Sequence, residues 1–208
     1  MDQTAKEELW NTYSHVVGVV FGVFGLAYLL AQDTHQSAYS TLSIWVYGIS
    51  FILLFGVSSW YHAIKEVDLK TTFRKLDHIC IYFLIAGSYT PVCLISLVHG
   101  NGWILFTCVW VISLLGLLLK LFYTGRFEMV SLLLYLAMGW LVVLDGRNVL
   151  EALSEQQLNL MILGGFFYTF GAVFYAMKRL KYQHVVWHFF VLGGAAAHYF
   201  MILSIVRG

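Results

Sequence analysis

Long apolar runs constrain the fold of this chain more than any other feature of its sequence. A helix of about 20 apolar residues crosses a bilayer core about 30 Å thick, and seven runs of this kind follow one another with only short polar connections. Charged residues make up 11% of the 208, against about 25% in soluble domains. We therefore expect an all-α, multi-pass membrane protein in which residues 1–208 form a single seven-helix domain. The predicted spans are residues 13–31, 41–64, 76–98, 103–122, 129–144, 158–177 and 184–205.

The distribution of lysine and arginine predicts how these spans are oriented. Basic residues concentrate in the connections on the cytoplasmic side of a membrane. Of the 12 basic residues, only Arg147 and Arg207 fall on the side opposite the N-terminus. We therefore expect a cytoplasmic N-terminus and an outer C-terminus. Nucleic acid is not an expected partner, because the charges lie in short loops and form no basic face. The sequence leaves the oligomeric state open.

Two histidines at the start of the last span predict a metal site. His184 and His188 are four residues apart, so on a helix they lie one turn apart on the same face, where two imidazoles could bind one ion. His62 ends the second span, Asp77 begins the third, and His15 lies near the start of the first. The predicted topology places all five in the cytoplasmic third of the membrane. Ionisable groups within a span usually face the bundle interior or a cavity.

The residue types of this group favour a catalytic zinc. A lone histidine in a span is as often a helix–helix hydrogen bond as a ligand, but the shared depth favours a metal ion. Imidazole suits zinc best, with iron or another transition metal as the alternative. Three histidines with one open position are typical of a catalytic zinc that activates water. His198 lies about 21 Å further along the last helix than His184 and should not reach the group.

Other polar residues near the group have two interpretations each. Asp77 could hold the water and take its proton. Ser58, one turn before His62, could orient the water or donate to an oxyanion, although a serine bonded to its own helix fits the spacing equally well. Glu8 and Asn11 precede His15 by seven and four residues and would align with it along one helix face. Capping and solvation explain those two equally well.

Four spaced motifs cover essentially the whole chain. They are ExxNxxxHxxG from residue 8, SSWYH at 58–62, FRKLDHICIYFLIAGSYTP at 73–91 and HxxxHxxVxxGxxxH at 184–198. With them the sequence resembles the hemolysin III family, the bacterial branch of the progestin and adipoQ receptor family. The resemblance implies a seven-helix bundle with a cytoplasmic N-terminus. It also implies a zinc ion held by His62, His184 and His188, with Asp77 and Ser58 as neighbouring polar residues.

The same resemblance implies an activity, because the wider superfamily includes alkaline ceramidases and is regarded as a group of metal-dependent lipid hydrolases. We therefore expect a zinc-dependent hydrolase in the bacterial cytoplasmic (inner) membrane, with a membrane lipid as substrate or ligand. It would cut a lipid amide or ester near the cytoplasmic face. Two alternatives stay open: a non-catalytic sensor or homeostasis protein with structural zinc, and a cytolysin, as the family name suggests. The shortage of polar residues along any span argues against the cytolysin.

Overall fold

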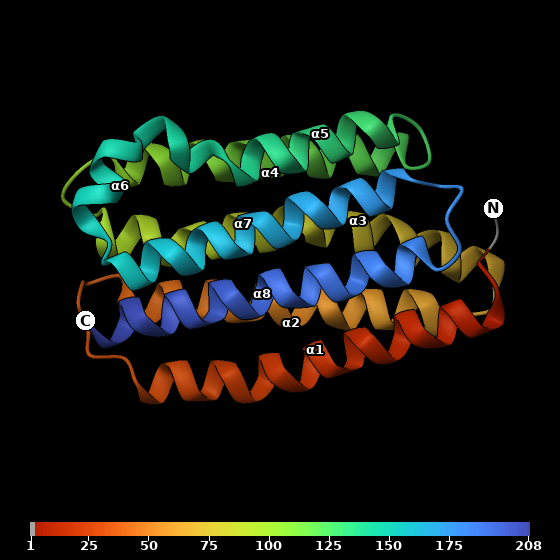
Figure 1. The fold of residues 1–208 in the computed structure, drawn as a ribbon, viewed down its shortest axis with the longest axis horizontal. Helices are drawn as coiled ribbons and strands as arrows, with labels where there is room; N and C mark the ends of the chain where they lie inside the picture. Colours follow the sequence, from red (N-terminus) through yellow and green to blue (C-terminus); the bar gives the residue numbers. More distant parts are fainter. Residues whose placement is uncertain (1–2) are drawn as a thin grey trace.

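The computed structural model describes residues 3–208 as a bundle of helices that run side by side (Figure 1). Seven stretches are long and apolar enough to cross a membrane, and the described residues contain no strand. The predicted all-α, seven-span architecture is therefore confirmed. The helices are α1 (Ala5–Ala31), α2 (Ser40–Ala63), α3 (Val67–Pro91), α4 (Gly102–Tyr123), α5 (Glu128–Gly139), α6 (Gly146–Ala152), α7 (Glu155–Ala176) and α8 (Gln183–Arg207).

Two spans are built from more than one helical segment. The third span continues from α3 through a π-helical turn, Val92–Ser96, and the fifth joins α5 to α6 through a 3-10 turn, Leu141–Asp145. A helix-breaking proline, Pro91, lies where α3 gives way to the π-helical turn. Proline cannot donate the usual backbone hydrogen bond, so a local change of helix type is expected at this point.

Several helices begin well before the apolar runs that revealed them. α1 begins at Ala5 rather than at residue 13, and α3 begins at Val67 rather than at residue 76. A capping box fixes the start of α1: the Thr4 hydroxyl accepts from the Glu7 N–H, and the Glu7 carboxylate accepts from the Thr4 N–H at 2.8 Å. Hydropathy marks only the part of a helix that lies in hydrocarbon, whereas backbone hydrogen bonding continues beyond it. The polar overhangs therefore stand outside the predicted spans.

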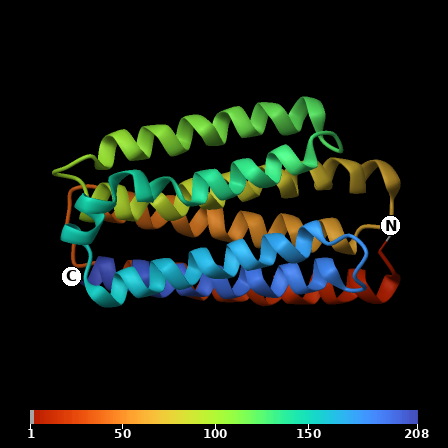
Figure 2. The same ribbon diagram turned by 45° about the horizontal axis from the view of Figure 1, so that its top comes forward.

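The helices are not arranged as a simple row. α8 packs against α7 and α1, α2 packs against α1 and α3, and α4 packs on the far side of α3. Figure 2 shows α4 and α8 on opposite sides of the bundle, with α2 and α3 between them. The start of α1, the end of α2 and the start of α8 lie at the same end of the bundle (Figure 1). This arrangement brings α2 and α8, which are far apart in the sequence, to the same place.

Small residues allow the central helices to approach closely. A Cβ at Gly18 of α1 would overlap the ring of Phe55 in α2, and a Cβ at Gly87 of α3 would overlap the Ser50 hydroxyl of α2. In a membrane, helix association depends on such close packing, because lipid tails are as apolar as the protein interior. α2 is thus held tightly between α1 and α3, and its last turn is fixed in position.

Candidate metal centre

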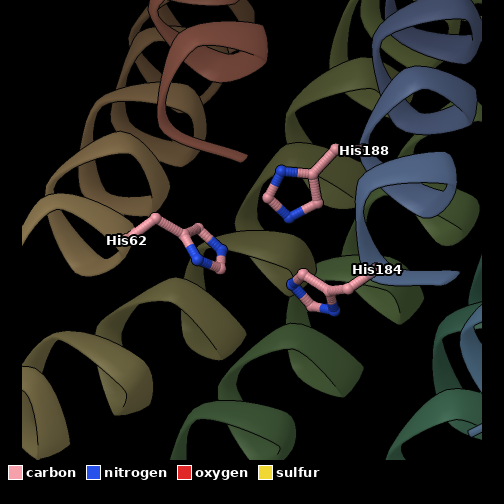
Figure 3. A group of neighbouring side chains, drawn as sticks. All are labelled: His62, His184 and His188. Atoms are coloured by element: carbon pink, nitrogen blue, oxygen red, sulfur yellow. The ribbon is translucent and has the colours of Figure 1, made fainter. Parts of the chain in front are cut away.

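Three histidines from two helices meet at one end of the bundle. His62 lies in the last turn of α2, and His184 and His188 lie in the first two turns of α8. Each offers one ring nitrogen, and these three atoms lie within 4.8 Å of one another. Figure 3 shows the three rings turned toward a common space. Zinc bound at about 2.0–2.1 Å in tetrahedral geometry separates its ligand atoms by about 3.4 Å, so the rings need only a small inward shift to share one ion.

The ring nitrogens of this three-histidine group lack other partners. Nε2 of His62, Nε2 of His184 and Nδ1 of His188 are buried and have no hydrogen-bond partner within residues 3–208. A buried polar atom left unpaired costs about 1–3 kcal/mol, so three in one place indicate a missing ligand. A metal ion would satisfy all three lone pairs, and imidazole is a preferred ligand of zinc. The residues therefore fit a zinc ion.

The second ring nitrogen of His62 is held by a carboxylate. His62 Nδ1 donates to Glu8 Oε2 of α1 at 2.6 Å, and Lys70 Nζ of α3 donates to Glu8 Oε1 at 2.8 Å. The sequence left the role of Glu8 open and placed Lys70 in a connecting loop, so this contact was missed. The available signal was an acidic residue in the polar start of α1, at the predicted depth of His62. Hydropathy cannot show which neighbouring helix such a residue contacts.

The other residues of the first motif pack beside the group. His15 stacks on His188, with 3.7 Å between ring centres and 19° between ring planes. His15 is not a member of the group that can share an ion, and both of its ring nitrogens are buried without a partner in the described part of the chain. Asn11 is fully buried and donates to Gln3 Oε1 at 2.8 Å. His15 therefore lies against a metal ligand, whereas Asn11 secures the start of α1.

Asp77 and Ser58 line the same cavity as His184 and His188. Both are buried, at 7% and 1% exposure. The Ser58 hydroxyl has no hydrogen-bond partner among residues 3–208. The adjacent Ser59, in contrast, donates to the Phe55 carbonyl one turn earlier at 2.7 Å. A serine bonded to its own helix therefore describes Ser59 and not Ser58, which leaves the Ser58 hydroxyl available to a molecule in the cavity.

The cavity is large and mostly apolar. Its volume is about 340 Å³, and its wall extends along α8 from His184 past His198 to Met201, roughly 26 Å at about 1.5 Å per residue. Trp140 and Ile162 line the cavity and are also 42% and 59% exposed on the outside of the bundle. The cavity therefore reaches the surface that acyl chains would cover in a bilayer. His198 lies in this wall but outside the three-histidine group, as its distance along the helix predicted.

Comparisons with known proteins extend over all of these residues. A family model described as "Haemolysin-III related" matches residues 3–199. The chain is 36% identical over 207 residues to Hemolysin-3 of Bacillus cereus, covering 99% of this chain and 94% of that protein. It is 37% identical over 201 residues to a Hemolysin-3 homolog of Bacillus subtilis (strain 168), covering 96% and 94%. A human protein, monocyte to macrophage differentiation factor, is 29% identical over 211 residues, covering 96% and 84%.

Proposed function

The chain belongs to the haemolysin-III related family, and from that premise we propose that it is a zinc-dependent hydrolase of a lipid amide or ester. The observation that carries this proposal is the set of three unpartnered imidazole nitrogens at the polar end of a long apolar cavity. We place it in the cytoplasmic membrane of a bacterium, because its bacterial relatives match nearly the whole chain. The bias of basic residues supports a cytoplasmic N-terminus.

The residues divide the work of hydrolysis between them. His62, His184 and His188 would hold the zinc, which when bound supplies a water activated at neutral pH. Asp77 lies on the same cavity wall and would take the proton from the attacking water. The unpartnered Ser58 hydroxyl would donate to the substrate carbonyl oxygen as negative charge develops on it.

The shape of the cavity supports a lipid substrate. An apolar space of about 340 Å³ with polar groups gathered at one end suits a chain-like molecule with one polar group. The carbonyl would lie at the histidine end and the acyl chain would extend toward Met201. Access is expected from the bilayer, past the exposed side chains of Trp140 and Ile162.

A structural zinc is the main alternative, and the number of ligands argues against it. Structural sites usually fill all four positions with protein ligands, whereas catalytic sites keep one open for water or substrate. Within residues 3–208 the group that can share an ion consists of three histidines. The fourth position would face the cavity that Asp77 and Ser58 line.

The test combines zinc content with lipid turnover in purified, lipid-reconstituted protein. We expect about one zinc per chain in the wild type and in Asp77→Asn, and none in the double variant His184→Ala/His188→Ala. Hydrolysis of a panel of lipid amides and esters should fall at least about 100-fold in Asp77→Asn, because proton transfer contributes about 10²–10⁴-fold. Stoichiometric zinc without any turnover would contradict the hydrolase and favour structural zinc. Leakage from dye-loaded liposomes would instead favour the cytolysin.

A further inference from the structure

The first two turns of α1 contact both ligand-bearing helices without supplying a ligand. Glu7 Oε1 accepts from the backbone N–H of Tyr182 at 2.9 Å, directly before α8. The next residue, Glu8, accepts from His62 of α2 at 2.6 Å. Two consecutive carboxylates therefore attach one overhang to the two helices that carry His62, His184 and His188. These two contacts differ in kind, because one is to backbone and the other is to a metal-binding ring.

The contact with Glu8 determines which nitrogen of His62 is free. The His62 side chain is fully buried. A neutral imidazole that donates from Nδ1 has its lone pair on Nε2. Nε2 is the His62 nitrogen that is buried without a hydrogen-bond partner in the described chain. The carboxylate thus selects the tautomer that can bind a metal ion, and it limits rotation of the ring.

Lys70 holds Glu8 in this position. Its ammonium donates to Glu8 Oε1 at 2.8 Å and to the carbonyls of Tyr61 and Ile64 at 3.3 and 3.2 Å. Those carbonyls lie at the end of α2, where backbone acceptors lack helical partners and a positive charge is favoured. With Lys70 on one oxygen and His62 on the other, the Glu8 carboxylate is fixed at both ends.

We propose that Glu8 is a positioning residue of the metal site, which orients His62 through Nδ1, and that Lys70 in turn orients Glu8. The proposal rests on the zinc site of the proposed function and extends it to α1, which provides no ligand. It predicts that zinc affinity depends on a residue more than 50 positions before the nearest ligand in the sequence. A purely structural role for Glu8 predicts no such dependence.

The experiment is a chelator competition that measures zinc affinity in the full-length protein. The variants are Glu8→Ala, Glu8→Gln and Lys70→Met, with Glu7→Ala as the matched control. Glu7 lies on the same overhang and contacts a ligand-bearing helix, but it touches no histidine. Loss of a carboxylate that orients a metal-binding histidine typically lowers metal affinity about 10–100-fold, and we expect this for Glu8→Ala. Glu8→Gln should recover part of the loss, because its amide oxygen can still accept from Nδ1.

Each outcome separates this proposal from the proposed hydrolase. Wild-type affinity in Glu8→Ala, or an equal loss in Glu7→Ala and Glu8→Ala, would overturn the positioning role. If Glu8→Ala does not fold, the comparison of Glu8→Gln with Glu7→Ala decides in the same way. Zinc binding that depends on Glu8 in a protein without hydrolysis would leave this proposal standing and remove the hydrolase. A wild type that binds no zinc would overturn both.

Discussion

The two halves of the bundle are held together in different ways. We call α1, α2, α3 and α8 the packed half and α4 to α7 the open half. In the packed half, 50%, 78% and 56% of the apolar windows of the spans formed by α2, α3 and α8 are buried, and 33% of that of α1. In the open half the values are 28% for α4 and 17% for each of the other two spans. The metal ligands all lie in the packed half, and the exposed part of the cavity wall lies in the open half.

This difference follows from the physics of helices in lipid. Lipid tails are as apolar as side chains, so burial alone does not drive helices together, and close packing or polar contacts must do so. In the packed half, Gly18 and Gly87 allow close approach. In the open half, side chains provide polar links: Trp140 Nε1 donates to the Thr169 hydroxyl at 3.0 Å, and Glu128 binds Lys120 at 3.1 Å. Close packing suits a metal site, and a looser wall suits lipid entry.

The largest expected effect tests whether charge holds the open half together. Glu128, the first residue of α5, accepts from Lys120 of α4 and from Arg74 of α3. The Lys120 side chain is 1% exposed, so Glu128→Ala would leave a buried ammonium without its charge partner. We expect a loss of about 3 kcal/mol in the free energy of unfolding, measured by denaturation in detergent.

An exposed ion pair in the same half provides the control. Arg147 and Glu151 of α6 are 3.0 Å apart but 91% and 65% exposed. Glu151→Ala should change the free energy of unfolding by less than about 0.5 kcal/mol. If Glu128→Ala had an equally small effect, the open half would not depend on its buried charges.

A smaller effect should appear when a methyl group is added to glycines of the two halves. In Gly87→Ala the new methyl group would overlap Ser50 of α2, whereas nothing lies within 4 Å of a Cβ at Gly139 of α5. Overpacking typically costs about 1–3 kcal/mol. We therefore expect Gly87→Ala to lower the unfolding temperature and Gly139→Ala to leave it unchanged or raise it slightly, since alanine favours helix. Equal behaviour of the two variants would remove the distinction between the halves.

The smallest expected effect concerns pH and the loop between α1 and α2. Burial raises the pKa of Asp33, but hydrogen bonds from Ser40, Thr41 and the His35 N–H outweigh it and leave the pKa below its ordinary value of 3.8. A carboxyl whose pKa is lowered by folding stabilises the folded state above its unfolded pKa. That contribution is lost as the pH falls through the lower folded value.

Unfolding curves at a series of pH values test this sign. Wild type should lose stability below about pH 4, and Asp33→Asn should lose less over the same range. At neutral pH the variant should be less stable by no more than about 1 kcal/mol, the worth of a typical hydrogen bond. A pH profile of Asp33→Asn parallel to that of the wild type would show that the loop carboxylate adds nothing to the packed half.

The placement of site residues could be predicted only in one dimension. The depths of His62, His184 and His188 followed from the positions of the apolar runs and from the helical rise, and the structure brings these residues together. The contact of Glu8 with His62 and the cavity beside Asp77 did not follow. Both involve neighbours across helices, and neither hydropathy nor helical period contains that information.

The sequence by itself determined the number of spans, the class of fold and the i, i+4 relation of His184 and His188. These properties depend on apolar runs and on the local geometry of a single helix. Only the tertiary structure decided that α8 begins beside the end of α2, and that the overhang of α1 reaches His62. A helix that is apolar on all sides has no face that marks its inward direction. Because lipid and protein interior are equally apolar, that direction is set by the close packing and polar contacts between helices.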